Sequence, residues 1–217
     1  MDRQRQRRSR KIVLPGRSAS AGLYVFEGPD GVGKSTLAKA CLRSLLGAGQ
    51  RAKYFPFPGN GPGTLGKLIY DLHHDRTRFG IKSIDQTSLQ TLHLAAHVDA
   101  IESKIRPQLE KGVTIILDRY WWSTLVYGKV LGANEASLSM LVELELNHWK
   151  TIKPTAVFLI SRKNPFGKSK NKVWKRLEIE YARIASEEQR NYPVHTITNQ
   201  TSVRDARQAI LECIARF

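Results

Sequence analysis

Four residues fit the pattern G-x-x-x-x-G-K-[ST], and their chemistry suits a phosphate group: Gly28, Gly33, Lys34 and Ser35. Glycines in such a loop let consecutive backbone N–H groups point at phosphate oxygens, because no Cβ stands in the way. The lysine can then reach the β- and γ-phosphates, and the serine hydroxyl can bind Mg²⁺. The pattern predicts a nucleotide-binding loop, in which we also expect Gly31 and Thr36 to contact the nucleotide.

The segments on either side of this loop are those that its mechanism needs. Residues 23–26 are apolar and of strand length, and apolar residues recur at helical spacing between Leu37 and Leu46. A strand that leads into the loop and a helix that begins there direct backbone N–H groups at the phosphates. A glycine-rich turn with an incidental lysine, the alternative, would leave this strand and helix unexplained.

A carboxylate is also needed near the metal, and Asp118 is placed to supply it. Residues 113–117 form an uninterrupted apolar run, typical of a central parallel strand that is buried on both faces. Asp118 and Arg119 follow at its carboxyl end, the edge at which open α/β sheets bind ligands. We predict that Asp118 serves Mg²⁺ and that Arg119 binds a phosphate, with a structural ion pair as the alternative.

Asp30 lies inside the loop, at a position that phosphate binding itself does not require. A carboxylate beside anionic phosphates costs electrostatic energy, so we predict a separate role, such as accepting a hydrogen bond from a substrate hydroxyl. Residues 56–64 are rich in proline and glycine and cannot be helical. They are predicted to form a loop on the substrate side that includes Pro58, an ordinary connection being the alternative.

A basic run follows the fourth predicted strand. Between residues 162 and 176 there are seven cations and no acid: Arg162, Lys163, Lys168, Lys170, Lys172, Lys175 and Arg176. Charge on a phosphoryl group in transfer must be neutralised, so one prediction is a mobile lid that brings these cations over it. A solvated face is the other interpretation.

Two groups of residues suggest a pocket for a planar base. Trp121, Trp122 and Tyr127 follow the Asp-Arg pair, and two adjacent tryptophans are not expected to face one core, so at least one should line a base-sized pocket. His93 and His97 are spaced i, i+4 on a predicted helix, which is also metal-ligand spacing. Without a cysteine or carboxylate at useful spacing, a polar pocket wall is favoured over zinc.

The order of predicted elements indicates a three-layer α/β fold, with a central parallel sheet of about five strands and helices on both faces. Strands are expected at residues 22–26, 52–55, 113–117, 156–160 and 194–197, and helices at 34–46, 65–74, 88–110, 137–149, 178–187 and 203–215. We expect a disordered basic tail over residues 1–20 and a single domain over residues 21–217.

Composition and charge narrow the class of protein. The chain has 217 residues, 41% of them hydrophobic, which is ordinary for one globular domain. Its net charge of +16 favours polyanionic partners or phosphorylated substrates, and the basic tail makes nucleic acid a candidate partner. Two cysteines fit a reducing cytoplasm. We expect no membrane span and no secretory signal, with a transit peptide as the alternative interpretation of the N-terminus.

These residues together resemble the thymidylate kinase family of P-loop nucleoside monophosphate kinases, over about residues 22–215. Residues 26–36 are similar to the family's F-E-G-x-[DE]-x-x-G-K-[ST]-T. Residues 118–127 are similar to its D-R-Y-x-x-S-x-x-[AV]-[YF], which is more specific than a phosphate loop alone. The resemblance implies a P-loop kinase fold, ATP and Mg²⁺ as cofactors, and a homodimer.

The resemblance also implies roles for single residues. Asp30 would contact the 3′-hydroxyl of the acceptor sugar, Asp118 would serve Mg²⁺ through water, and Arg119 would hold the acceptor phosphate. Gly31 stands where some members have an arginine. The catalytic cation should therefore come from the lid, with Arg162 as the candidate.

The chain departs from the family's pattern on the acceptor side. The loop of residues 56–64 contains no basic residue, although the family usually has an arginine there for the acceptor phosphate. Residues 94–98 read L-A-A-H-V in place of F-x-A-[DN]-R. We therefore expect a rebuilt acceptor pocket, lined by Leu94, His97, Val98 and Trp122.

The sequence thus predicts an ATP- and Mg²⁺-dependent phosphotransferase that converts a nucleoside monophosphate, dTMP or a related one, to the diphosphate. The missing phosphate arginine and the basic tail leave one alternative open, a kinase with another acceptor such as a nucleoside or a modified base in DNA. The net charge leaves a second alternative, a nucleic-acid-associated ATPase.

Overall fold

The computed structural model describes residues 21–167, 170–200 and 202–217. Its centre is a parallel sheet with the strand order β2-β3-β1-β4-β5. The strands are β1 (Leu23–Glu27), β2 (Ala52–Pro56), β3 (Thr114–Asp118), β4 (Ala156–Ser161) and β5 (Val194–Thr198). The predicted α/β fold is confirmed. The tail predicted for residues 1–20 and Lys168 of the basic run lie outside the described residues.

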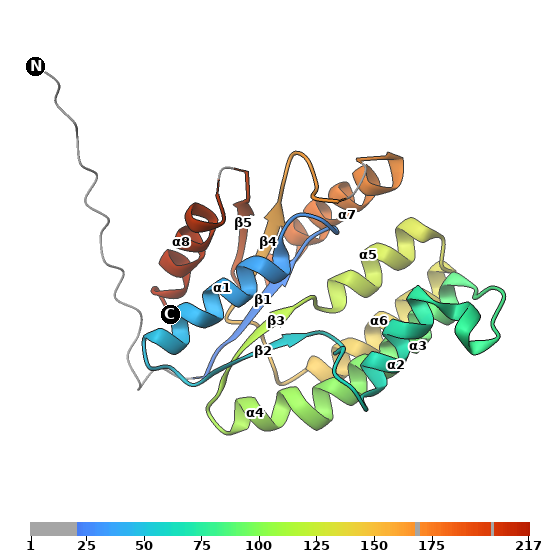
Figure 1. Ribbon diagram of the computed structural model, residues 1–217, viewed down its shortest axis with the longest axis horizontal. Coiled ribbons are helices and arrows are strands. Elements are labelled where there is room, and N and C mark those ends of the chain that lie inside the picture. The colour runs from blue at the N-terminus through green and yellow to red at the C-terminus, as the bar shows by residue number, and fades with distance from the viewer. Residues whose placement is uncertain (1–20, 168–169, 201) are drawn as a thin grey trace, which may run out of the picture.

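Helices cover both faces of this sheet, and alternate strand residues pack into two cores. Val25 and Leu117 belong to the core on one face, Phe26 and Phe158 to the core on the other. Helices α1 (Lys34–Gly47) and α8 (Val203–Ile214) cover the second of these faces (Figure 1). The other helices are α2 (Leu65–His74), α3 (Gln86–Ala100), α4 (Arg106–Glu110), α5 (Trp121–Leu131), α6 (Glu135–Trp149) and α7 (Lys172–Glu188). In the described part of the chain, none of the helices has the length and hydropathy of a membrane span.

The register of the central strands brings two distant segments together at one edge. Phe26 of β1 pairs with Asp118 of β3, and the backbone N–H of Arg119 donates to the carbonyl of Phe26 at 2.9 Å. The loop that follows β1 and the residues that follow β3 therefore meet at the carboxyl end of the sheet.

The elements between β3 and β4 differ from the prediction. The sequence predicts one helix there, over residues 137–149, but the chain forms two, α5 and α6. Gly132 ends α5 in the left-handed conformation, with φ of 89°, and the Asn134 side chain caps the start of α6. The helix predicted over residues 88–110 is also interrupted, by a π-helical turn at Ile101–Ile105.

Candidate active site

The loop between β1 and α1 depends on glycines at positions where a side chain does not fit. Gly28, Gly31 and Gly33 have φ of 134°, 85° and 95°. A Cβ on Gly28 would lie 2.5 Å from the carbonyl oxygen of Ile160 in β4. The loop can therefore keep its path against the sheet only with glycine at this position.

Lys34 begins α1 at the end of this loop, and its side chain is only 6% exposed. Its Nζ donates to the carbonyl of Pro29 at 2.8 Å and lies 4.0 Å from a carboxylate oxygen of Asp30. Burial, and after it the charge of Arg119, lowers the pKa of Lys34 to about 8, although the charge of Asp30 opposes the shift. Lys34 is thus a desolvated cation, directed into the loop.

Asn199 supports the phosphate loop from the end of β5, and the sequence did not identify it as a site residue. This residue is 1% exposed and follows β5. Its side-chain amide donates to the carbonyl of Val32 at 2.8 Å, and a Cβ on Gly33 would collide with the same amide. The only signal in the sequence is a polar residue directly after an edge strand, at the carboxyl end of the sheet.

We expect Asn199→Ala to lower the free energy of unfolding by about 1–3 kcal/mol, because the buried Val32 carbonyl would lose its donor. Denaturant unfolding measures this change. The matched control is Asn191→Ala, which removes an exposed amide whose partner is Glu188, with an expected change within about 0.5 kcal/mol. Equal effects of the two substitutions would contradict the supporting role of Asn199.

Asp118 lies at the end of β3, where it meets the first turn of α1. One oxygen of its carboxylate accepts hydrogen bonds from the Ser35 hydroxyl and, at 2.8 Å, from the Tyr54 hydroxyl. Carboxylate and hydroxyl oxygens are ligands that Mg²⁺ accepts, so the donor set fits that ion. Tyr54 belongs to β2, beside β3, and was not a candidate in the sequence, since its role depends on strand order.

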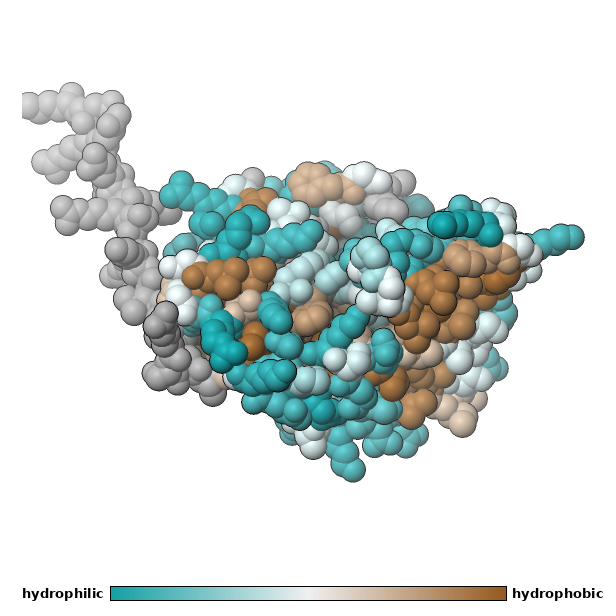
Figure 2. Space-filling view, turned by 60° about the horizontal axis from the view of Figure 1, so that its bottom comes forward, coloured by the Kyte–Doolittle hydropathy of each residue, from teal (hydrophilic) through white to brown (hydrophobic). Residues whose placement is uncertain are grey.

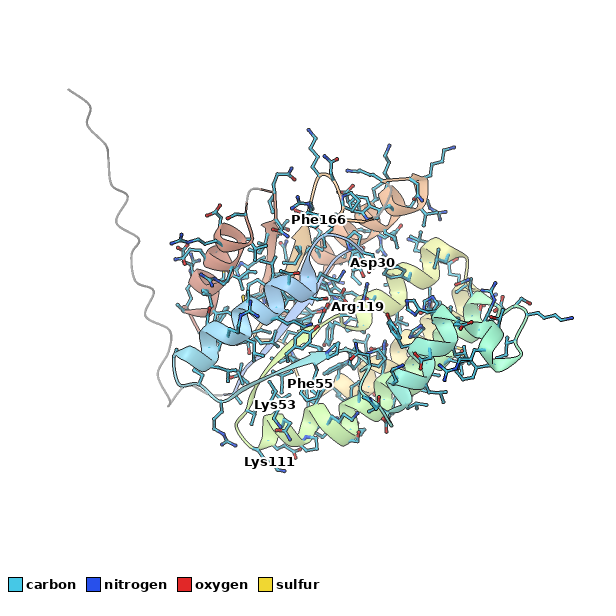
Figure 3. The ribbon with its side chains drawn as sticks, viewed as in Figure 1. Asp30, Lys53, Phe55, Lys111, Arg119 and Phe166 are labelled. Atoms are coloured by element: carbon cyan, nitrogen blue, oxygen red, sulfur yellow. The ribbon has the colours of Figure 1, made fainter. Side chains whose placement is uncertain are left out.

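Arg119 and Asp30 form an ion pair between the end of β3 and the loop after β1 (Figure 3). The second terminal nitrogen of Arg119 donates to the hydroxyl of Ser123 at 3.1 Å. Arg119 has a φ of 82°, a conformation that a non-glycine residue rarely adopts. Backbone strain at a charged residue in a cleft indicates a position selected for its side chain.

Glu27 fixes the turn from which Arg119 projects, and it was missed as a site residue in the sequence. Glu27 has no exposed surface. Its Oε1 accepts from the backbone N–H groups of Tyr120 at 2.7 Å and Ser123 at 3.2 Å, and its Oε2 accepts from the Ser123 hydroxyl at 3.0 Å. Burial raises the pKa of Glu27 to about 7, although the charges of Arg119 and Lys34 oppose the rise. The signal for this role was an acid at the end of an otherwise apolar strand.

Two cavities meet at the Asp30–Arg119 pair. The first has a volume of about 470 Å³ and contains most of the predicted nucleotide and metal residues: Gly31, Gly33, Lys34, Ser35, Thr36 and Asp118. The second has a volume of about 520 Å³, and its lining includes Gln90, His93, His97, Thr124 and Tyr127. Asp30, Arg119, Phe57 and Pro58 line both. The predicted residues of the loop and of the D-R-Y segment are thus brought together around two adjoining spaces.

Helix α3 forms one wall of the second cavity. His93 and His97, predicted as a polar pocket wall, both line it, whereas Leu94 and Val98, also predicted to line the acceptor pocket, do not. Gln90, His93 and His97 have the spacing of one helical face, and all three line the cavity. Leu94 and Val98 are among the lining residues of neither cavity, and Leu94 is 3% exposed in the interior. Each lies one position after a lining histidine, and that step turns it by about 100° around the helix.

The prediction that one tryptophan lines a base-sized pocket is wrong. Trp121 and Trp122 are 5% and 0% exposed, and both belong to the core on one face of the sheet. The indole N–H of Trp122 donates to the hydroxyl of Tyr192 at 3.0 Å. Both side chains can be buried because helices α3, α6 and α7 all pack against α5. Tyr127, about one and a half turns later on α5, does line the second cavity.

The basic segment begins as a strap against the phosphate loop. The Phe166 N–H donates to the carbonyl of Gly31 at 2.8 Å, and Phe166 lines the first cavity. The guanidinium of Arg162 lies 3.7 Å from the centre of the Phe166 ring and donates to the carbonyl of Asn199. A Cβ on Gly31 would lie 2.7 Å from the Phe166 carbonyl, which explains glycine there. Helix α7 begins at Lys172, six residues before the predicted start, so the later cations of the run are helical.

Comparison with known proteins decides the family. The family model described as "Thymidylate kinase" matches residues 26–210. The chain belongs to the thymidylate kinase family. This match includes the phosphate loop, the D-R-Y segment and both cavities.

Individual relatives agree with this family. The chain is 35% identical over 108 residues to a thymidylate kinase of Chlamydia muridarum, over 50% of each chain. It is 33% identical over 110 residues to a thymidylate kinase of Gluconobacter oxydans, over 50% of this chain and 49% of that protein. The chain thus spans about half the length of these curated relatives. The crystal structure of thymidylate kinase from Ehrlichia chaffeensis has the same fold, with a TM-score of 0.70 at 18% identity, over 90% of this chain and 100% of that one.

Proposed function

We propose that this protein transfers the γ-phosphoryl group of ATP to a nucleoside monophosphate, dTMP or a related one, and yields the diphosphate. The observation that carries the proposal is the Asp30–Arg119 pair at the meeting point of two cavities. One cavity contains Lys34, Ser35 and Asp118 and suits a triphosphate, and the other suits an acceptor. Membership of the thymidylate kinase family supports this assignment.

The donor side would work by position and charge. The backbone N–H groups of the loop and the Lys34 ammonium would hold the β- and γ-phosphates. Ser35 and Asp118 would provide oxygen ligands for Mg²⁺, which when bound supplies charge neutralisation to the phosphates. No covalent intermediate with the protein is required, since alignment and electrostatic stabilisation account for catalysis in this class of reaction.

The acceptor side would depend on Arg119 and Asp30. Ser123 and Asp30 hold the guanidinium of Arg119 in one orientation, so its donors are fixed before an acceptor phosphate arrives. Asp30 would also accept a hydrogen bond from a sugar hydroxyl. Arg162 is not among the residues that line the first cavity, but it stacks on Phe166, which is, and donates to the Asn199 carbonyl. It is the proposed lid cation that would stabilise the transferred group on closure.

Purified protein with ATP, Mg²⁺ and a panel of acceptors tests the proposal. The panel contains dTMP, dUMP, other monophosphates, thymidine and oligonucleotides, and both ADP release and product mass are measured. We expect a diphosphate product from at least one pyrimidine monophosphate and none without Mg²⁺. Transfer to thymidine or to oligonucleotides alone would contradict the proposal, and ADP release without a phosphorylated product would indicate an ATPase.

Three sequence predictions about partners and location stay predictions. Nucleic-acid binding was assigned to residues 1–20, which lie outside the described residues. A homodimer is supported by apolar side chains that α6 exposes, Met140 and Leu144 among them. Figure 2 shows hydrophobic residues, in brown, gathered mainly on the right-hand part of the molecule. A location in the cytoplasm is the third.

A further inference from the structure

A buried carboxylate lies behind the second cavity, where neither the fold nor the transfer chemistry requires one. Glu145 of α6 has no exposed surface. One oxygen accepts from His97 Nδ1 at 3.0 Å and from the Trp149 indole at 3.5 Å, and the other accepts from the Thr124 hydroxyl at 2.8 Å. Glu145 is therefore fully surrounded by α3, α5 and its own helix.

Such a group costs folding free energy compared with an apolar residue of similar size. A carboxylate loses its hydration when it is buried, and its partners recover only part of that loss. Among the described residues, His97 is the one that forms an ion pair with Glu145. The pair thus indicates a role for the ring that Glu145 orients.

His97 is held on several sides and has one edge directed to the ligand space. Its ring stacks on Phe57 at a centroid distance of 4.2 Å and an interplanar angle of 25°. Its Nδ1 faces Glu145 and, at 3.4 Å, the hydroxyl of Thr124. His97 lines the second cavity, and the polar contacts that its ring makes with other described residues are those of Nδ1. Nε2 is therefore the atom of this ring that a ligand can use.

We propose that His97 hydrogen-bonds the base of the acceptor through Nε2, and that Glu145 is the positioning residue that fixes its ring. This inference rests on the proposed function, since Arg119 and Asp30 in the same cavity would take the phosphate and sugar ends. In this role His97 is the imidazolium, the form that neutralises the buried carboxylate of Glu145. In that form Nε2 carries a hydrogen and donates, whereas a neutral ring with its hydrogen on Nδ1 would accept there. The matching ligand atom is a carbonyl oxygen on the Watson–Crick edge of the base, as in thymine, uracil or guanine, in place of an exocyclic amine.

The length of two amide side chains gives a sharp test. In His97→Asn the amide can take the place of Nδ1 beside Glu145, but no atom reaches the position of Nε2. In His97→Gln the amide reaches the position of Nε2 but not that of Nδ1. Glu145→Gln keeps the volume and removes the charge, and Glu143→Gln, an exposed position on the same helix, is the matched control.

The measured quantity is the ratio of kcat/KM for dTMP or dUMP to kcat/KM for dCMP, with KM for ATP as a check on the donor site. We expect the wild-type ratio to be tenfold or more, and to fall about tenfold in His97→Asn and in Glu145→Gln. The ratio should stay close to wild type in Glu143→Gln and partly recover in His97→Gln. KM for ATP should change less than twofold in every variant. A purely structural role of Glu145 would lower all activities together and leave the ratio unchanged.

The outcomes separate this inference from the proposed function. Transfer to monophosphates with an unchanged ratio in His97→Asn and Glu145→Gln would overturn the inference and leave the proposed function intact. If a variant is unstable by thermal unfolding, the ratio of the equilibrium constants for binding dTMP and dCMP is measured on the remaining variants, and it should fall in the same direction. Failure of the wild type to bind any monophosphate by calorimetry would overturn both.

Discussion

Lys34→Met is expected to lower kcat by about 10³-fold, the largest effect of any single substitution in this site. The Lys34 ammonium is 6% exposed and lies at the end of the loop that would hold the triphosphate, where its charge acts at close range in a desolvated position. Methionine has a similar length and no charge. Steady-state kinetics with ATP and the preferred acceptor measure the effect.

The fold should survive this change, which makes the test specific to function. Burial of an ammonium group costs free energy, as the lowered pKa of Lys34 shows, so its replacement by an apolar side chain should not reduce the free energy of unfolding. Denaturant unfolding checks this point. A kcat within tenfold of wild type in a folded Lys34→Met protein would contradict the assigned role.

The same residue predicts how ATP affinity depends on pH. The pKa of Lys34 is about 8 without ATP, and bound phosphates must raise it because they favour the cation. Below pH 8 the cation is already present, whereas above pH 8 binding must take up a proton. ATP affinity should therefore fall as pH rises above 8, by up to tenfold per pH unit. Calorimetry in two buffers of different ionisation enthalpy measures the uptake, which Lys34→Met should abolish.

The donor half of the site could be predicted because its signals are local. The phosphate loop, its strand and its helix occupy one continuous stretch, and Asp118 follows a recognisable buried strand. Contacts between distant segments gave no such signal. Asn199 and Val32 are separated by 167 positions, and the Tyr120 N–H and Glu27 by 93. Their partners depend on strand order and register, which residue types alone do not determine.

The acceptor half was harder to predict because burial there depends on helix packing. The expectation for the two tryptophans assumed that a helix has one buried side, whereas α5 is enclosed by three helices and buries both residues. The comparison with the family motif selected residues 94–98, whereas the i, i+4 spacing selected His93 and His97, and the helix turns Gln90, His93 and His97 toward the cavity. His97 is the one residue that lies both within residues 94–98 and among those that line the second cavity.

The two halves of the site lie on different kinds of elements, and this separates the residues for catalysis from those for acceptor specificity. The groups that would move a phosphoryl group are at the carboxyl ends of β1 and β3, where the sheet fixes them. The groups that would read the acceptor are on α3 and α5, outside the sheet. Helix positions can change side chain with less effect on the sheet, so an acceptor pocket can diverge while the phosphate loop stays intact.

Asp118→Asn is expected to lower kcat by about 10²-fold and to increase the Mg²⁺ concentration needed for half-maximal activity. Asparagine keeps an oxygen that can accept from the Ser35 and Tyr54 hydroxyls, so the end of β3 should keep its geometry. The change removes the negative charge that would attract the ion. Kinetics over a range of Mg²⁺ concentrations measure both effects.

Tyr54→Phe is the control for this change, because it removes a hydrogen bond to the same carboxylate oxygen and leaves the charge in place. We expect a less than tenfold effect on kcat and an unchanged Mg²⁺ requirement. If Asp118→Asn and Tyr54→Phe had equal effects, Asp118 would act through its hydrogen bonds alone. An Asp118→Asn protein with a normal Mg²⁺ requirement would show that the ion is held elsewhere, and that Asp118 serves only to position Ser35.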